Sequence, residues 1–471
     1  MSLSAALNTA VIGLQTLQSQ TRLVSGNVAN AQNPDYSRKV STLTTPITDG
    51  LPAAALIASI TRVAAPEIQQ DLYRITGDYG RLEQQLTYTK ELAETLDATN
   101  TTGDQPTLLA MLTRFEDAWK QLEATPEDTA TKSLLVQRAS ELTAEIRRLN
   151  GLQSELQNRA QENLVIDLDV VNEAALQIAK LNTQITSQGS GGNPVGDLED
   201  LRDAEVIKLA DKIGIRTVIN DRGELFVYTD GGVQIVGTVA QQFEYQATGT
   251  PPGIFTQGGT SNLNLGFQNG SVRASLDYLD ATTTGLADTD PNVGAMTKFF
   301  NQLDSFAANL ADVVNTAYGA TFFDFSSPLA TPPDEAGKII VEATIAATPS
   351  TVDSSVAGAV QQALRNTTLT AANINRSATD PNGLTITSVN IFGLANAVLA
   401  YQARAAADNE SNRDTAERQT HALDLKLRNL TGVNIDDELA QLQVLQNNYA
   451  ALANVMNTIT SMFDVLVSIG R

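Results

Sequence analysis

The stretch that decides the fold lies near the end of the chain, at residues 435–466, and it reads IDDELAQLQVLQNNYAALANVMNTITSMFDVL. Apolar side chains recur there at every seventh position in two sets that are offset by three, which is the a/d pattern of a coiled-coil helix. The first set is Ile435, Leu442, Tyr449, Met456 and Phe463, and the second is Glu438, Leu445, Leu452, Ile459 and Leu466. Glu438 is the one polar residue in this stripe. The pattern predicts a single long helix.

The positions beside this stripe lack the charges that usually flank a two-stranded coiled coil. No charged residue occurs between Glu438 and Asp464. The flanking positions are amides or the apolar residues Leu439, Val455, Met462 and Val467. The amides interrupt the run too often for a membrane span, so we expect no membrane insertion. We expect instead a helix that contacts neighbouring protein on several sides.

The beginning of the chain carries the same periodicity. One set is Leu3, Ala10, Leu17, Val24 and Ala31, and the other is Leu7, Leu14, Thr21 and Val28. A single helix of this length is marginal in water, whereas each buried Leu-sized side chain contributes roughly 1.5–3 kcal/mol. We therefore expect the two terminal helices to lie against each other or against other subunits. Two ordinary amphipathic helices on a globular core would show the same periodicity.

The composition limits the possible functions. A chain of 471 residues is long enough for two to four domains. It has no cysteine and one histidine, which excludes disulfides, thiolate sites and multi-histidine metal sites, and we expect no cofactor. The net charge of −22 argues against binding to nucleic acid or anionic membranes. The first residues lack the basic region and cleavage site of a secretory signal, so we expect a cytosolic protein or one exported without a cleaved signal.

Between its ends the chain alternates long helices with less regular regions. The first helix is expected to stop before Pro34, and strands are expected at 40–43 and 56–60. A helical region then begins at Pro66, and further helices are expected at 107–122, from an N-cap at Thr125 to residue 185 with a weak point at Gly151, and at 197–213. The long helices predict a bundle.

The less regular regions are expected to be rich in β-structure. A strand, turn and strand are expected at 215–219, 221–223 and 225–229, with a further strand at 338–341 and a helix at 356–365. From residue 391 the chain is expected to be helical to its end, apart from a turn at Thr431-Gly432. The predicted fold class is mainly α with an inserted β-rich region. The predicted domains are a terminal coiled-coil assembly domain (1–62 and 430–471), a bundle of long helices (63–205, 272–321 and 385–429) and an outer β-rich domain (206–271 with part of 322–384).

No group of residues has the pattern of an active site, so we predict that the chain is not an enzyme. His421 lies in a polar helix without a nucleophile to activate, and we expect it to face solvent. The acids at 436–438 are interpreted as first-turn residues that complement the helix dipole. A second acidic group is interpreted as a solvated helix face: Glu199, Asp200 and Asp203, interleaved with Arg202.

Three stretches resemble the flagellar axial proteins, the family of rod, hook and hook-associated proteins. The first is SGNVANAQNPDYSR at 25–38, which is similar to the motif that ends the first helix in this family. The second comprises GVNIDDE at 432–438, QNNY at 446–449 and MFDVL at 462–466, similar to the family's C-terminal signature. The third, DLEDLRD at 197–203, and the Tyr-Ser-Arg at 36–38 are most similar to the members at the hook–filament junction. Asp35 stands where the family usually has Gly, and residues 33–36 fit a type I turn, so we expect the local path of the chain to differ there.

The resemblance implies a structural protein of the bacterial flagellum, located outside the cell and exported unfolded through the type III channel. It implies self-association in a ring, with the hook protein on one side, the next hook-associated protein on the filament side, and an export chaperone in the cytoplasm. The terminal helices would make the assembly contacts. The predicted interface residues are Leu3, Leu7, Leu14, Leu17, Val24, Val28, Asn30, Pro34, Tyr36, Ile435, Leu442, Leu445, Tyr449, Leu452, Met456, Ile459, Phe463 and Leu466.

Two alternatives remain open from the sequence. The chain is also compatible with another axial component, such as a hook protein or a flagellin-like protein. It is also compatible with a secreted adhesin that binds its ligand through the β-rich insertion.

Overall fold

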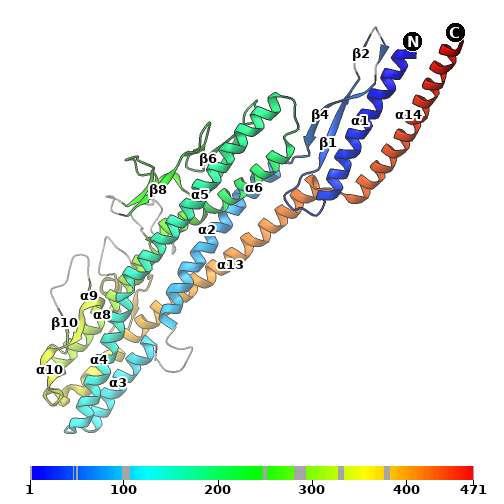
Figure 1. The fold of residues 1–471 in the computed structure, drawn as a ribbon. Coiled ribbons are helices and arrows are strands. Elements are labelled where there is room, and N and C mark those ends of the chain that lie inside the picture. The colour runs from blue at the N-terminus through cyan, green and yellow to red at the C-terminus, as the bar shows by residue number, and fades with distance from the viewer. Residues whose placement is uncertain are drawn as a thin grey trace. The chain divides into compact units, whose positions relative to one another are not determined.

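The structure is a computed structural model, and it describes residues 3–45, 47–48, 51–52, 54–97, 107–247, 252–279, 293–326, 334–375 and 382–469. These residues are mainly helical, with small antiparallel sheets (Figure 1), so the predicted fold class is confirmed. They divide into two compact units. The terminal unit comprises residues 1–76, 170–242 and 417–471, and the central unit comprises residues 77–169 and 243–416. The division into three functional domains stays a prediction.

Two antiparallel helices from opposite ends of the chain form one part of the terminal unit. Helix α1 (Leu3–Asn30) lies beside α14 (Ile435–Ile469), with both chain ends at the same end of the pair (Figure 1). Leu17, Val24 and Leu445 are buried between them. The helices approach closely at Gly13, where an added Cβ would lie 3.1 Å from Leu452 Cδ1. The expected contact between the terminal helices is present within a single chain.

A β-ribbon follows α1. Strands β1 (Lys39–Thr44) and β4 (Leu56–Arg62) pair antiparallel with Lys39 opposite Arg62, as the predicted strands require. Two short strands, β2 (Ile47–Thr48) and β3 (Leu51–Pro52), pair beyond them. The Thr16 hydroxyl donates to the Ala55 carbonyl oxygen at 2.9 Å, which fixes the ribbon against α1.

The rest of the terminal unit surrounds the short helix α6 (Gly196–Lys212). The predicted hairpin at 215–229 is confirmed, with Ile219 opposite Leu225 in a sheet of order β5-β6-β7. Its strands are β5 (Ile215–Ile219), β6 (Leu225–Thr229) and β7 (Gln234–Val236). Three long helices contribute residues to both units: α2 (Pro66–Asp97), α5 (Gln153–Ser190) and α13 (Ile391–Thr431).

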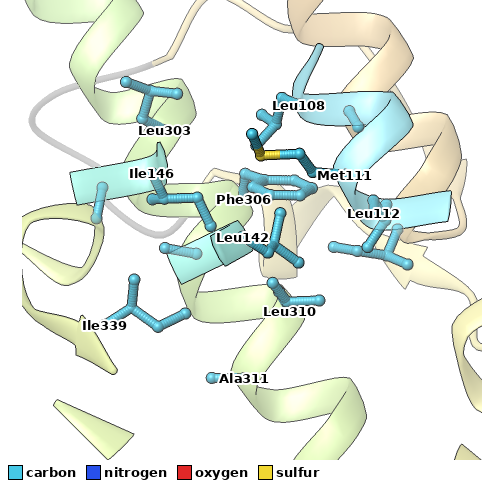
Figure 2. Close-up of a cluster of buried hydrophobic side chains, with 14 of the residues drawn as sticks. Leu108, Met111, Leu112, Leu142, Ile146, Leu303, Phe306, Leu310, Ala311 and Ile339 are labelled. Carbon is cyan, nitrogen blue, oxygen red and sulfur yellow. The ribbon is translucent and has the colours of Figure 1, made fainter. Parts of the chain in front are cut away.

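The central unit has a large apolar core between α3 (Leu108–Ala124), α4 (Thr129–Gly151) and α8 (Ala295–Tyr318). Figure 2 shows the ring of Phe306 among Leu108, Met111 and Leu142. An aromatic cluster extends this core, and the only tryptophan is part of it: Phe115, Trp119, Tyr318, Phe322 and Phe323. Trp119 is therefore a natural probe of the central unit.

Short elements complete the central unit, and the predicted strand at 338–341 and helix at 356–365 are among them. The strands pair in three antiparallel hairpins, β8–β9, β10–β11 and β12–β13. The strands are β8 (Phe243–Gln246), β9 (Gly253–Thr256), β10 (Phe323–Phe325), β11 (Ile339–Val341), β12 (Leu369–Thr370) and β13 (Ser388–Val389). The helices are α7 (Gly270–Leu279), α9 (Glu335–Lys338), α10 (Ala343–Ala347), α11 (Ala357–Asn366) and α12 (Ala371–Ile374).

One predicted cap is wrong. Asp128, rather than Thr125, is the N-cap of α4, and its carboxylate accepts a hydrogen bond from Ala130 N at 3.1 Å. Thr125 instead ends α3, where its backbone N–H donates to the Gln121 oxygen. Both residues are good caps by type, so composition alone did not separate them. The predicted break at Gly151 is correct, since α4 ends there and α5 begins at Gln153.

The C-terminal helices contain a segment that is long and apolar enough to cross a membrane. Within residues 391–468, one 18-residue window has a mean hydropathy of 1.3 and at most two charged residues, and 6% of it is buried. This length and composition alone do not show a membrane span, because a helix that packs against other protein can have the same hydropathy and length. The expectation of no membrane insertion stays a prediction.

Candidate assembly interface

The structure places the predicted interface residues of α1 on several sides of the helix. Leu14, Leu17 and Val24 are buried. Partly buried positions are Leu3, Leu7 and Val28 on the helix and Tyr36 after it, whereas Asn30 and Pro34 are exposed. Leu17 and Val24 pack against α14, so they stabilise the pair within one chain.

The predicted residues of α14 divide in the same way. Leu445 and Ile459 are buried. Leu442, Leu452, Met456 and Phe463 are partly buried, whereas Ile435, Tyr449 and Leu466 are exposed. The heptad stripe thus contains both contacts within the chain and positions that α1 does not cover.

Many large apolar side chains of α14 are exposed. We use the name outer face for nine of them, which lie on either flank of the contact with α1 and are 41–59% exposed: Ile435, Leu439, Val444, Tyr449, Val455, Met462, Val465, Leu466 and Val467. Val444 and Val465 were not singled out from the sequence, although the absence of charge around them was the signal. So many exposed apolar side chains on one helix favour a contact with other protein. Six of the nine lie outside the two heptad sets, so the outer face would extend the predicted interface beyond those sets.

Glu438, the polar exception in the stripe, is completely buried at the base of the terminal pair. Its Oε1 accepts from Arg38 Nε at 2.6 Å, and its Oε2 accepts from Asn27 Nδ2 at 3.1 Å. All three acids lie in the first turn of α14, as interpreted from the sequence. Asp436 and Asp437 are exposed there, whereas Glu438 also binds two other segments, which the sequence interpretation did not include. Sequence periodicity gave no sign that Arg38 would reach it.

Asn27 connects four segments at this point. Its Nδ2 donates to the Lys39 carbonyl oxygen at 2.9 Å as well as to Glu438. Its Oδ1 accepts from Lys39 N at 3.0 Å and from the Tyr36 hydroxyl at 2.9 Å. Both amide atoms are satisfied, so the end of α1, the following turn, β1 and the start of α14 are held together.

Tyr36 serves this network as a donor. Burial raises the pKa of Tyr36 to about 12, and the charges of Asp197, Asp200 and Glu438 add to the shift. The phenol therefore keeps the proton that it donates to Asn27 at any physiological pH. The Lys39 ammonium lies 3.8 Å from the centroid of the Tyr36 ring, a cation–π contact.

The acids of α6 bind the β-ribbon instead of facing solvent. The buried carboxylate of Asp200 accepts from Ser37 N and Arg62 Nη1, each at 3.1 Å, and pairs with Lys39 Nζ. Glu199 and Asp203 also pair with Arg62. The prediction of a solvated face is wrong, because the ribbon places two cations on this helix and a sequence pattern does not show such long-range partners. Burial lowers the pKa of Arg62, but the three acids outweigh it and the net shift is upward.

Arg202, on the same helix, binds in the opposite direction. It is 1% exposed, and its Nη1 donates to Asn182 Oδ1 at 3.1 Å and to the Gly223 oxygen at 2.7 Å. Asn182 in turn bonds both backbone groups of Leu225. Burial lowers the pKa of Arg202, and nearby acids oppose the shift. Helix α6 therefore joins the ribbon to the β5–β6 hairpin.

A cavity of about 230 Å³ opens beside this network. It is bounded by the turn at 31–37, the end of β4, α6 and the end of α13. Its charged lining residues are Asp35, Asp200, Asp203, Asp424, Arg62 and Arg428. Among the described residues no group of three or more His, Cys, Asp or Glu side chains is placed to hold a metal ion. His421 is exposed, as expected.

Comparison with known proteins extends the sequence resemblance over the whole chain. Flagellar hook-associated protein 1 of Escherichia coli (strain K12) is 23% identical, and the match covers 99% of this chain and 100% of that protein. Residues 93–322 match the family described as "Flagellar hook-associated protein FlgK helical domain". The resemblance to flagellar hook-associated protein 1 is confirmed. The protein of that name from Bacillus subtilis (strain 168) is 24% identical over 98% of this chain and 97% of its own length.

One solved structure also matches part of the chain. "The structure of the flagellar hook junction protein FlgK from Burkholderia pseudomallei" aligns with 54% of this chain and 46% of that chain, at 19% identity and a TM-score of 0.44.

The stretches that carry the resemblance meet in one network. Asn27, Tyr36 and Arg38 belong to the first motif, Asp200 to the third, and Glu438 to the second. The features that resemble flagellar hook-associated protein 1 are therefore the ones that fix the base of the terminal helix pair. The sequence identified the motifs, but it did not show that they bind one another.

Proposed function

We propose that this chain is a structural component of the hook–filament junction and that it assembles through α1 and α14. The observation that carries the proposal is the outer face of α14, which stays exposed and uncharged when the inner face has already packed on α1. The names of its relatives support the location, since each is a flagellar hook-associated protein.

Assembly would bury the apolar side chains of α14 that are partly exposed in a single chain. Each exposed apolar side chain of the outer face gains roughly 1.5–3 kcal/mol if a neighbouring copy covers it fully. In the monomer, α14 has α1 as its main packing partner, and an isolated helix pair of this kind is only marginally stable. We propose that the terminal pair becomes fully ordered between neighbouring copies in a ring, which couples folding to assembly.

The network around Asn27 and Glu438 would set where each terminal pair starts. It fixes the exit of α14 relative to the β-ribbon and α6. Every copy would then present its outer face at the same angle, which a closed or helical ring requires. We further propose export through the type III channel with a chaperone, a place outside the cell, and contacts with the hook protein on one side and the next hook-associated protein on the other.

The test is the binding of purified full-length protein to hooks isolated from the bacterium that encodes it, viewed by negative-stain electron microscopy. We expect a new layer at one end of the hook. Removal of residues 1–35 or 432–471 should abolish that layer. Bare hooks together with coated filaments would instead indicate another axial component, and the junction role would be wrong.

A further inference from the structure

We propose that Arg22 of one copy pairs with Asp35 of a neighbouring copy, at the rim of that copy's cavity. The proposal rests on the proposed function, because it names a contact between assembled copies. It concerns a charged contact that the apolar stripes do not provide.

Arg22 and Asp35 are the only charged residues between residues 3 and 37. Both are exposed, and neither has an ion-pair partner in the part of the chain that the structure describes. They have opposite signs and stand on a segment that is otherwise built for apolar contact. This charge complementarity favours a second copy of the chain as the partner.

Pairing within one chain is out of reach. From Arg22 to the end of α1 at Asn30 the helix rises about 12 Å, and Asp35 lies further on in a separate turn. That turn is closed by a hydrogen bond from Tyr36 N to the Asn33 oxygen at 3.2 Å, and Asp35 N donates to Asn33 Oδ1 at 3.2 Å. A copy displaced along the axis of α1 brings Arg22 to the level of its neighbour's Asp35.

The surroundings of each group favour this pairing. A guanidinium in an apolar interface is costly unless a carboxylate neutralises it, and the facing helix has no acid between Glu438 and Asp464. Glu438 is already bound to Arg38 and Asn27. Besides Asp35, the cavity lining has three acids, and all three pair with its two arginines. Asp35 is therefore the acid of this lining that has no ion-pair partner among the described residues and can take a further cation.

Reciprocal charge exchange tests the contact. We would measure the concentration dependence of hook binding by co-sedimentation for the wild-type chain, Arg22→Asp, Asp35→Arg and the double variant. Each single variant should bind about ten-fold more weakly, equivalent to about 1.4 kcal/mol, and the double variant should recover most of that loss. Arg222→Asp in the exposed β5–β6 turn is the matched control for the charge change, and Trp119 fluorescence confirms that the central unit is folded.

Crosslinking tests the same contact without removing either charge. The chain has no natural cysteine, so chains with Gln18→Cys and chains with Gln32→Cys, both exposed positions, can be mixed on hooks and joined with a short thiol-specific reagent. We expect mixed dimers on hooks and none in free solution.

Two results would overturn the pairing: wild-type binding by Arg22→Asp, or a double variant that binds no better than the single variants. If these occur while the wild-type chain binds hooks, the proposed function stands and only this contact is wrong. If the wild-type chain does not bind hooks, the proposed function and this contact are both wrong.

Discussion

At the scale of single residues, Asp200 is the centre of the contact between α6 and the β-ribbon. It binds Ser37, Lys39 and Arg62, and both it and Lys39 are more than nine-tenths buried. Removing one partner from a buried ion pair leaves an uncompensated charge, which costs about 3–5 kcal/mol. The ribbon should therefore depend on this one carboxylate.

We predict that Asp200→Asn loosens the ribbon, with a loss of about 3 kcal/mol in the local free energy of opening. Hydrogen exchange of the amides at 39–44 and 56–62 measures it. Asp197→Asn is the control, because Asp197 also pairs with Lys39 but its side chain is 84% exposed, and exposed pairs contribute little. Equal protection in the two variants would contradict the account.

The buried Asp304 predicts a pH dependence in the central unit. Burial raises the pKa of Asp304 to about 7, helped by the charges of Glu335 and Asp334 and opposed by the hydrogen bond from Ala336 N. Between pH about 4 and 7 the folded chain keeps this proton while the unfolded chain has lost it. The contribution to stability is therefore complete below pH 4 and falls as the pH rises to 7.

We predict that Asp304→Asn stabilises the central unit at pH 8, by up to about 4 kcal/mol, and changes it little at pH 4. Asparagine keeps an oxygen that accepts from Ala336 N but carries no charge. Urea unfolding followed by Trp119 fluorescence reports on this unit alone. The same change in stability at both pH values would show that Asp304 does not titrate as described.

At the scale of elements, we expect two neighbouring positions of α14 to have separate roles. Leu452 packs toward Gly13 of α1, whereas Val455, three positions further on, is 48% exposed. A charge at position 452 would disturb the packing of α14 on α1 within the chain. A charge at position 455 would cost desolvation free energy only when a neighbouring copy covers it. The pair of positions therefore separates folding of the terminal helices from assembly.

We predict that Val455→Asp blocks hook binding while the helix content of the free chain, measured by circular dichroism, is unchanged. Leu452→Asp should block binding and also lower the helix content. Both should leave the unfolding of the central unit, followed by Trp119, as in the wild type. Normal assembly of Val455→Asp would show that the outer face is not an interface.

An element can be predicted from the sequence when the residues that cause it lie within its own segment. The sequence predicts the helices α1 and α14 and the strands at 40–43, 56–60, 215–219 and 225–229, because the periodicity of each lies within its own segment. The burial of Glu438, Asp200 and Arg202 was not predicted, because it depends on partners that are 20 to 411 positions away in the chain. By residue type alone, a charged residue is assigned to the surface. Its structural role can be assigned only when its distant partners are known.

At the scale of the whole molecule, the chain fixes the base of its terminal pair and leaves the outer side of that pair open. The motifs at 25–38, 197–203 and 432–438 form the network, and the side chains of the outer face of α14 are 41–59% exposed. These motifs carried the resemblance in the sequence, and comparison with flagellar hook-associated protein 1 confirmed the resemblance. The proposed ring would depend on other copies, so no single segment of the sequence would encode it.

The central claim is that neighbouring copies complete the terminal pair, and amide hydrogen exchange across residues 435–466 tests it most directly. The exchange should be measured on the free chain and on the chain bound to hooks, with the core helix α8 as an internal standard. We predict fast exchange of α14 in the free chain and protection close to that of α8 after binding. Slow exchange in the free chain, or no added protection on hooks, would contradict the claim.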